Sequence, residues 1–569
     1  MEHLGTSAYR QDWDIYYDSL YGYVLLHPRI RAALDLRLMQ RLRHIKQLST
    51  VPLVFSGANH TRFEHSVGVY HLATHVFDTL RLKYGSDDRF ATLFTPVKKL
   101  ALQLAALFHD LGHGPTSHTF ELFCTRCLEQ DTLGHEAMTT ALIEGNIPDH
   151  RSVYEFLTHV HTEVDESRPD DRDVGLLEPA CIAALARGQA PGRYKNLQYL
   201  GQIISSSIDV DKMDYLRRDA LNCGLGTGSV DVWGIIHNFV VYEDKAVWNA
   251  GLSSDAAPIL EAFLATRDHA YRQIYYQKTH RIAQELVIAA LCDLTRRDGG
   301  IEPKKVALMT DDELFAAFQN PATGTPLTKK VADRILYRQV YECLPIEVKV
   351  HEDLDRRAVL QWKEYSRPKR KGDYETFMAG LRTLAVKLGM PEAETVIFDM
   401  PRTPVMKREA FTDAYFVDRD SGKVRSLLDL CPHLNLTYGS HRLPTGEVLD
   451  LYALYEELIS TIRFAVPPEF LDAVLRKAYT ASCRALEGRP RVDPLLKALR
   501  GEISASLDPI LLHFMNTLGV SDEIKREALS SRFRTAMIRS LIDRLLTRWQ
   551  IDGSTKQALR ERIAGPGLE

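Results

Sequence analysis

The stretch that decides the fold runs Leu107-Phe-His-Asp-Leu-Gly-His-Gly-Pro-Thr-Ser-His118. It completes a segment, residues 97–111, in which apolar side chains recur every three or four positions, as they do on the buried face of an α-helix. Two glycines and a proline follow, and residues of this kind end helices. His109 and Asp110 therefore lie at the end of a predicted helix.

Two further motifs of the same chemistry flank this stretch. Upstream, the chain reads His60-Thr-Arg-Phe-Glu-His65 where a predicted helix over residues 65–82 begins; downstream, it reads Ile208-Asp-Val-Asp-Lys-Met-Asp-Tyr215. Imidazole and carboxylate groups suit first-row divalent metals, and a mixed ligand set leaves positions open for water and substrate. A lone histidine–aspartate dipeptide is common, but three such motifs together are not. The sequence therefore predicts a metal centre where helix ends converge.

The bulk composition is that of an ordinary globular protein. The chain has 569 residues, 45% apolar and 26% charged, with a net charge of −4, so no global signature of nucleic-acid binding is present. Of the eight cysteines, only Cys124 and Cys127 form a C-x-x-C pair, which argues against a zinc ribbon. The sequence shows neither an apolar signal region nor a run of 18 apolar residues. We expect a cytoplasmic protein without a membrane partner.

Hydrophobic patterning divides the chain into four predicted parts. Two short strands open the chain, and helical spacing then dominates to about residue 300. Strand-like patterns follow at 344–354, 394–400 and 413–425, before helical spacing returns at 450–486 and in an amphipathic tail at 521–550. We expect a mainly α-helical protein with a helical core, a smaller α+β C-terminal lobe and a helical tail. The predicted boundaries are 1–35, 36–335, 336–487 and 488–569.

The three motifs, in this order, resemble the signature of the HD superfamily. Residues 13–65 are similar to the deoxynucleoside triphosphate (dNTP) triphosphohydrolases, especially the vertebrate enzymes that join a sterile-alpha-motif domain to an HD domain. The similarity continues through residues 206–220 and 265–278, weakens to about residue 480, and does not cover the tail. The helical core is therefore expected to be an HD domain.

The resemblance implies a metal site and a reaction. The implied metal ligands are His65, His109, Asp110 and Asp211. Family members hold iron, zinc, manganese or magnesium there, and some hold two ions. The implied reaction is hydrolysis at the α-phosphorus of a dNTP, which releases a deoxynucleoside and inorganic triphosphate and lowers the dNTP pool. Defence against phage is one candidate purpose.

The implied phosphate contacts are cationic, as a polyphosphate requires. Arg62 lies three residues before His65 and resembles the family arginine that holds the phosphate chain, and Lys212 and Arg267 match the γ-phosphate contacts. Around the α-phosphate, His113 and His135 match histidines that line it. The alternative for these two histidines is packing near a helix end.

The leaving 5′-oxygen needs a proton. His118 matches the family general acid, and Glu121 is the expected carboxylate that orients it. Most relatives have aspartate at the second position, so Glu121 is a departure that lengthens the reach of the carboxylate.

Selectivity for the sugar is implied by a separate set of residues. Tyr215 and Asp219 lie one helical turn apart, and Asp219 can accept a hydrogen bond from a 3′-hydroxyl. Tyr275 matches the ring that packs under the deoxyribose, and Gln47 and Leu48 match the pair that flanks the sugar. We expect a preference for deoxyribonucleotides with no strong choice of base.

Relatives are commonly activated by nucleotides bound between subunits. Asp35, Gln40 and Arg43 match the residues that recognise a regulatory guanine; the alternative is a solvated helix face with a salt bridge. Other regulatory positions depart, with Asp14 in place of a lysine and Trp233 near the position of an arginine. We expect homo-oligomers, tetramers among them, whose activity depends on a nucleotide.

Two other functions remain open. The first is an HD phosphohydrolase that acts on a nucleoside monophosphate, a cyclic nucleotide or an alarmone. The second is a catalytically silent nucleotide sensor, with nucleic-acid binding by the basic side of the tail as a lesser option. The residues that match a triphosphate and a deoxyribose favour the dNTPase.

Overall fold

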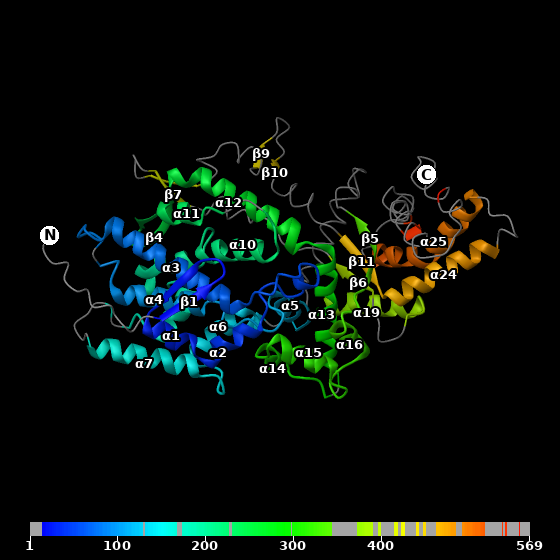
Figure 1. Cartoon of the computed structure of the whole chain (residues 1–569), viewed down its shortest axis with the longest axis horizontal. Helices are drawn as coiled ribbons and strands as arrows, with labels where there is room; N and C mark the ends of the chain where they lie inside the picture. The colour runs from blue at the N-terminus through cyan, green and yellow to red at the C-terminus, as the bar shows by residue number, and fades with distance from the viewer. Residues whose placement is uncertain are drawn as a thin grey trace.

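The computed structural model shows an elongated, mainly helical molecule (Figure 1). It describes the ranges 14–90, 92–128, 131–167, 173, 175–226, 230–297, 299–343, 373–390, 396–399, 415–418, 423–426, 440–442, 448–450, 462–484 and 492–517, and positions 538, 541, 542 and 557. The predicted mainly α-helical fold class is confirmed. The predicted strand at 344–354 and nearly all of the amphipathic tail at 521–550 lie outside these residues.

Most of the helices belong to the first 300 residues. They are α1 (Pro28–Leu34), α2 (Arg37–Arg41), α3 (Arg62–Tyr84), α4 (Pro96–Phe108), α5 (His118–Phe123), α6 (His135–Ile143), α7 (Ser152–Ser167), α8 (Pro179–Ala186), α9 (Gln198–Ile204), α10 (Val210–Asn222), α11 (Val232–Asn238), α12 (Ala257–Ala270) and α13 (Lys278–Arg296). Further along the chain come α14 (Pro303–Ala307), α15 (Asp311–Gln319), α16 (Pro326–Ala332), α19 (Asp373–Lys387), α24 (Pro468–Arg484) and α25 (Val492–Thr517).

Local signals explain where the helices of the core begin. Helix α3 starts with a capping box, in which the side chain of Glu64 accepts a hydrogen bond from the backbone of Thr61. Helix α4 starts at a proline behind the cap Thr95, and α10 starts behind the cap Asp209. The helices predicted at 65–82 and 97–111 are therefore confirmed as α3 and α4.

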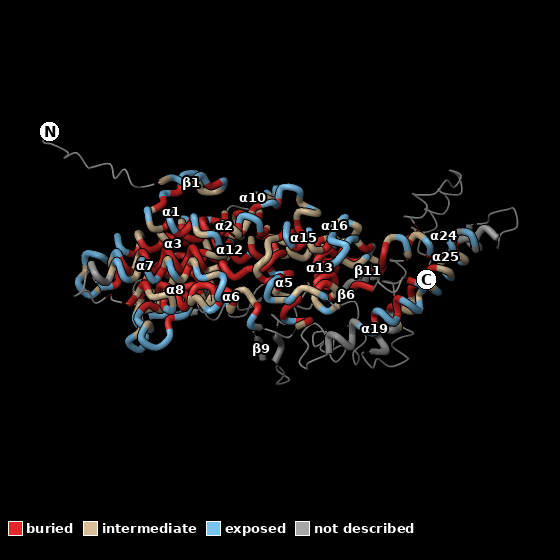
Figure 2. Tube along the Cα trace, turned by 90° about the horizontal axis from the view of Figure 1, so that it is seen from below, coloured by how far each residue is buried: buried red, intermediate tan, exposed pale blue. Residues whose placement is uncertain are grey.

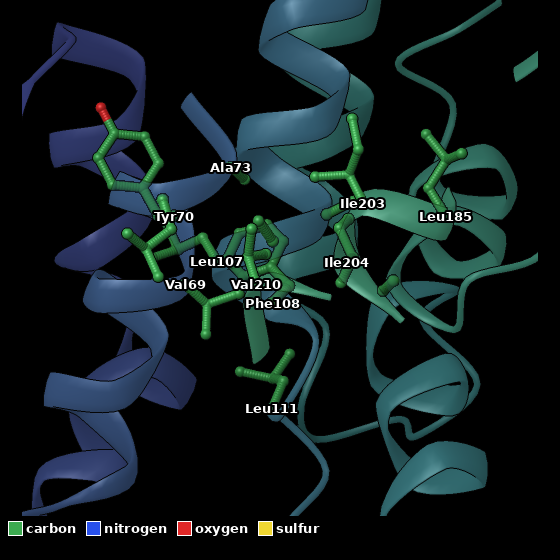
Figure 3. Close-up of a cluster of buried hydrophobic side chains, with 14 of the residues drawn as sticks. Val69, Tyr70, Ala73, Leu107, Phe108, Leu111, Leu185, Ile203, Ile204 and Val210 are labelled. Atoms are coloured by element: carbon green, nitrogen blue, oxygen red, sulfur yellow. The ribbon is translucent and has the colours of Figure 1, made fainter. Parts of the chain in front are cut away.

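Apolar faces of α3, α4, α9 and α10 meet in one core. Figure 3 shows Val69 and Ala73 of α3 beside Leu107 and Phe108 of α4, with Ile203 of α9 opposite. All five side chains are buried. Figure 2 shows that buried residues continue along the helical core. The packing fixes the ends of α3, α4 and α10 relative to one another.

A β-hairpin covers one side of this core, as predicted for the start of the chain. Strands β1 (Asp14–Asp18) and β2 (Gly22–Leu26) pair antiparallel, and Gly22 adopts a φ of 74°, which favours glycine. Asp18 closes the turn by accepting from the backbone N–H groups of Leu20 and Tyr21 at 2.8 and 3.0 Å. The hairpin therefore enters the fold as a defined unit.

Three more small sheets complete the fold. The strands are β3 (Phe239–Asp244), β4 (Val247–Ser253), β5 (Arg338–Cys343), β6 (Ile397–Asp399), β7 (Tyr415–Val417), β8 (Val424–Ser426), β9 (Ser440–Arg442), β10 (Val448–Asp450) and β11 (Ile462–Val466). Their sheets have the orders β3-β4-β7-β8, β5-β11-β6 and β10-β9, and only the β4–β7 pair is parallel among the described strands. Figure 1 shows β5, β6 and β11 beside α13, which links them to the core.

The later part of the chain both confirms and corrects the sequence analysis. The strands predicted at 394–400 and 413–425 are present as β6, β7 and β8. The helical spacing predicted over 450–486 is wrong for residues 462–466, because this segment pairs with β5 and β6 as β11. The hairpin of β3 and β4 was not predicted, since its half-buried residues interrupt an otherwise helical region.

Candidate metal centre

Three helix ends converge on one point in the core, the N-terminal ends of α3 and α10 and the C-terminal end of α4. The Nε2 atom of His65 lies 3.0 Å from Oδ1 of Asp211 and 3.6 Å from Oδ2 of Asp110. The Nε2 atom of His109 lies 3.5 Å from Oδ1 of Asp110 and 3.8 Å from Oδ1 of Asp211. The structure thus brings together the four residues predicted as ligands, which we call the His–Asp group.

Both histidines of the group turn the same ring nitrogen toward its centre. Nδ1 of His65 lies 2.8 Å from Oδ2 of Asp214, and Nδ1 of His109 donates to the backbone carbonyl of Ala106 at 2.9 Å. The Nε2 atoms of both are buried and make no well-aligned hydrogen bond among the described residues. Outer hydrogen bonds of this kind hold the imidazoles that bind metals, so the donor set fits a divalent cation.

The charges of the group also favour a cation. Burial lowers the pKa of His65, but the carboxylates of Asp211 and Asp214 outweigh burial and raise it to about 10. Burial raises the pKa of Asp211, but His65 and His109 bring it down to about 2. In the metal-free protein a proton on His65 therefore balances the ionised carboxylates, at the place that a divalent ion would take.

A second layer of charges supports Asp214. The guanidinium of Arg218 donates to both oxygens of Asp214 at 2.9 Å and to Asp18 of the β-hairpin at 3.0 Å, and all three side chains are buried. Asp214 and Arg218 lie four residues apart on α10, so their pairing could have been found from the sequence. None of these three residues was predicted to have a role.

A strained turn follows the His–Asp group and leads into α5. Thr116 and Ser117 have φ values of 59° and 52°, which residues with a Cβ rarely adopt. Asp311 accepts from the backbone of Thr116 at 2.6 Å, and the hydroxyl of Ser117 donates to the carbonyl of Lys46 at 2.7 Å. Strain of this kind persists where the surroundings enforce it, and here it sets the position of His118.

One carboxylate holds two of the predicted catalytic histidines. Glu121 accepts from Nδ1 of His118 at 3.0 Å and from Nδ1 of His135 at 2.9 Å, and these two partners keep the pKa of Glu121 well below its usual range against the effect of burial. The ring of His113 stacks on that of His135, with centroids 4.3 Å apart. The three histidines each offer a nitrogen within 4.8 Å of the others, so they form a second group able to hold a cation.

Of the three predicted phosphate contacts, Arg62 contacts the His–Asp group directly, whereas Lys212 and Arg267 contact other residues. Arg62 donates to Asp110 at 2.6 Å, which places its guanidinium beside the His–Asp group. Lys212 is bonded to the carbonyl of Ser206 at 2.9 Å and to Asp209. Arg267 is buried next to Tyr215, and its Nε atom has no hydrogen-bond partner among the described residues.

Two of the predicted sugar contacts, Tyr215 and Asp219, lie on α10, the helix that also carries Asp211. Asp211, Tyr215 and Asp219 follow one another at four-residue intervals, so they share one face of α10. Asp219 is buried and accepts a hydrogen bond from the hydroxyl of Tyr275. Gln47 is buried, and the next residue, Leu48, is partly buried. The side-chain oxygen of Gln47 has no hydrogen-bond partner in the described structure.

The predicted regulatory residues lie outside the metal centre. The Nε atom of Arg43 donates to the side-chain oxygen of Gln40 at 2.9 Å, and its guanidinium lies 3.6 Å from the centre of the Phe63 ring. Gln40 also donates to the carbonyl of Leu34, while Asp35 caps α1. Gln40 and Arg43 therefore share one side of their helical segment, as predicted.

Comparison with known families places these groups in one recognised unit. The HD domain family matches residues 62–219, and the HD associated region matches residues 230–432. The first match contains all four residues of the His–Asp group. The chain contains an HD domain. Its HD domain thus runs from the first turn of α3 into α10, which carries Asp211, Asp214 and Asp219.

Similar proteins come from distant organisms. Over 385 residues the chain is 28% identical to deoxynucleoside triphosphate triphosphohydrolase SAMHD1 of Danio rerio, a match that covers 63% of this chain and 60% of that protein. It is 31% identical over 329 residues to human SAMHD1, which covers 56% of this chain and 50% of that protein. It is 32% identical to the uncharacterized protein YwfO of Bacillus subtilis, covering 49% and 55%. The chain therefore spans about half to three-fifths of the length of these relatives.

A solved structure shares the fold of this HD-domain protein. A hypothetical protein from Aquifex aeolicus matches 80% of this chain and 97% of its own, with a TM-score of 0.52 and 23% identity. At this identity the match concerns the fold alone. Among the described helices, none has both the length and the apolar character needed to cross a bilayer.

Proposed function

We propose that this HD-domain protein is a metal-dependent phosphohydrolase that converts dNTPs to deoxynucleosides and inorganic triphosphate. The observation that carries the proposal is the shared face of α10, on which Asp211, Tyr215 and Asp219 lead from the His–Asp group toward Tyr275. A nucleotide with its α-phosphate at the His–Asp group would place its sugar against Asp219 and Tyr275. The similarity to SAMHD1 proteins supports the same substrate.

Each group of side chains has a role in this proposal. A divalent ion on the His–Asp group would polarise the α-phosphate and supply an activated water. Arg62 and Arg267 would hold the phosphate chain by charge-assisted hydrogen bonds. His118, oriented by Glu121 through the 3.0 Å hydrogen bond, would donate a proton to the leaving 5′-oxygen.

The proposal includes regulation by a nucleotide. Gln40 and Arg43 are already bonded to each other beside Phe63, which lies on the first turn of α3 between Arg62 and His65. A regulatory nucleotide on Gln40 and Arg43 would therefore act one side chain away from the proposed metal and phosphate ligands. We also propose a homo-oligomer, with a tetramer as the first form to test.

Product analysis tests the reaction. The purified chain would be incubated with each dNTP and with GTP, alone and in mixtures, in Mn²⁺ or Mg²⁺, and the products separated by anion exchange. A deoxynucleoside plus triphosphate is expected, with higher rates in mixtures if a nucleotide activates. Release of orthophosphate or pyrophosphate, or cleavage of a monophosphate or cyclic nucleotide only, would contradict the dNTPase proposal.

Two histidines on the same helix provide a matched control. His65→Ala removes a proposed ligand and should abolish product formation, whereas His75→Ala removes an exposed imidazole of α3 and should leave it unchanged. Equal activity of the two variants would contradict the role of the His–Asp group.

A further inference from the structure

His60 contacts the proposed sugar site although the sequence analysis gave it no role. Its Nε2 atom lies 2.8 Å from Oδ1 of Asp219, and only 2% and 1% of the two side chains are exposed. The other oxygen of Asp219 accepts from Tyr275. Asp219 is thus held by one partner on each oxygen.

The backbone fixes the position of His60. Its carbonyl accepts from the backbone N–H of Gln47 at 3.0 Å, and Lys46 and Thr61 form an isolated antiparallel bridge beside this bond. Thr61 then caps α3. Because the chain is pinned on both sides of His60, its imidazole presents Nε2 to α10 from a fixed point.

Only one ring nitrogen of His60 makes a hydrogen bond in the described structure, and its partner is Asp219. A carboxylate only accepts, so Nε2 of His60 carries the proton, while Nδ1 is buried without a partner in the described structure. A buried unsatisfied nitrogen costs stability, which an apolar side chain would avoid. A carboxylate offers about four acceptor positions, so after His60 and Tyr275 the Asp219 oxygens can still accept a hydrogen bond from a hydroxyl.

We propose that His60 is a positioning residue, which holds Asp219 in the orientation that recognises the 3′-hydroxyl of the substrate sugar. The inference rests on the proposed dNTPase function and adds the residue on which sugar recognition depends. Without the donor at Oδ1, the carboxylate of Asp219 could turn toward Tyr275 alone. The 3′-hydroxyl would then lose its partner.

The test combines a substitution with a change in the substrate. The kcat and KM values for dATP and 2′,3′-dideoxy-ATP would be measured for the whole chain with Mn²⁺, because both changes remove the same interaction. The wild type should prefer dATP by about tenfold or more, as expected for a site that pairs with a hydroxyl. His60→Ala should lower kcat/KM for dATP about 10- to 100-fold and leave dideoxy-ATP nearly unchanged.

Two further variants separate positioning from stability. His60→Gln can place an amide N–H near the position of Nε2 and should retain the preference for dATP over dideoxy-ATP. The shorter His60→Asn cannot reach that position and should lose the preference. It therefore provides the test even if His60→Ala does not fold. His280→Gln is the control, because His280 is also buried but bonds to Thr50. It should keep the wild-type ratio.

The outcomes are distinct. Two results would overturn the positioning role while leaving the dNTPase proposal intact. One is a fall in kcat/KM of equal size for dATP and dideoxy-ATP in His60→Ala, and the other is a wild-type ratio of the two kcat/KM values in His60→Asn. A wild type that releases no deoxynucleoside from any dNTP mixture would overturn the proposed function, and this inference with it, before any variant is made.

Discussion

The Nδ1 atom of His65 lies 2.8 Å from Oδ2 of Asp214, and this contact directs the opposite ring nitrogen between Asp110 and Asp211. Asp214 itself stands outside the His–Asp group. Its effect on a bound ion would therefore pass through the imidazole of His65, which makes it a sensitive point for mutation.

Replacement of Asp214 should weaken metal binding without removing a ligand. In Asp214→Asn the amide cannot hold the imidazole as a carboxylate does, and partners of this kind are worth about 10- to 100-fold in metal affinity. Metal content and competition with a chelator would measure the loss. Asp78→Asn, which disturbs a partly exposed pair with Lys99, is the control and should bind metal normally. Equal affinities would show that Asp214 has no part in metal binding.

Metal binding should release a proton and strengthen as pH rises. In the metal-free protein the pKa of His65 is raised from 6.5 to about 10, so the group is charged at pH 8 and must lose its proton to bind an ion. About one proton should appear per ion bound at pH 8 and about half a proton at pH 10, measured with an indicator in weak buffer. The stabilisation that this proton gives the metal-free fold is present below pH 6.5 and is lost as pH rises through about 10. An affinity independent of pH between 7 and 9 would contradict the assignment.

Glu121 should affect turnover more than binding. Glu121→Gln cannot accept from both His118 and His135 as a carboxylate does, so the proposed acid loses its orientation. We expect kcat to fall about 10- to 100-fold with KM within about threefold. The exposed Glu136→Gln, on the neighbouring α6, should match the wild type. A change confined to KM would assign Glu121 to substrate binding instead.

Gly112 allows α6 to approach the end of α4. A Cβ at this position would collide with the backbone nitrogen of Thr139 and the carbonyl of His135, neither of which can rotate away. Gly112→Ala should therefore destabilise the protein by about 1–3 kcal/mol, measured by chemical unfolding. Gly501→Ala, on α25 with open space around it, should be neutral or stabilise by up to about 1 kcal/mol. Equal stability of the two variants would contradict the packing argument.

The sequence was most informative where local signals agree. Helices α3 and α4 and the opening hairpin follow from apolar periodicity and from caps within a few residues. His65, His109 and Asp211 each lie at a helix end, so their convergence could be predicted from three motifs. Their roles as ligands stay a prediction.

The rest depends on contacts between distant positions. Arg218 and Asp18 are separated by 200 residues and His60 and Asp219 by 159, and no local pattern reports such pairs. The parallel pairing of β4 with β7 is equally remote. The positive φ of Ser117 could not be predicted from the sequence either, because serine does not favour this conformation. Hydrogen bonds to distant residues such as Lys46 enforce it.

The chain of contacts from Asp18 through Arg218 and Asp214 to His65 has a consequence for biosynthesis. Its members come from the first hairpin, the first HD helix and a helix made some 150 residues later. During translation Asp18 of the hairpin and His65 of α3 therefore stay exposed to water until α10, which carries their partners, has emerged from the ribosome. An ion captured before that point would meet only two histidines and one carboxylate, so loading of the proposed metal would be a late event that follows completion of the HD domain.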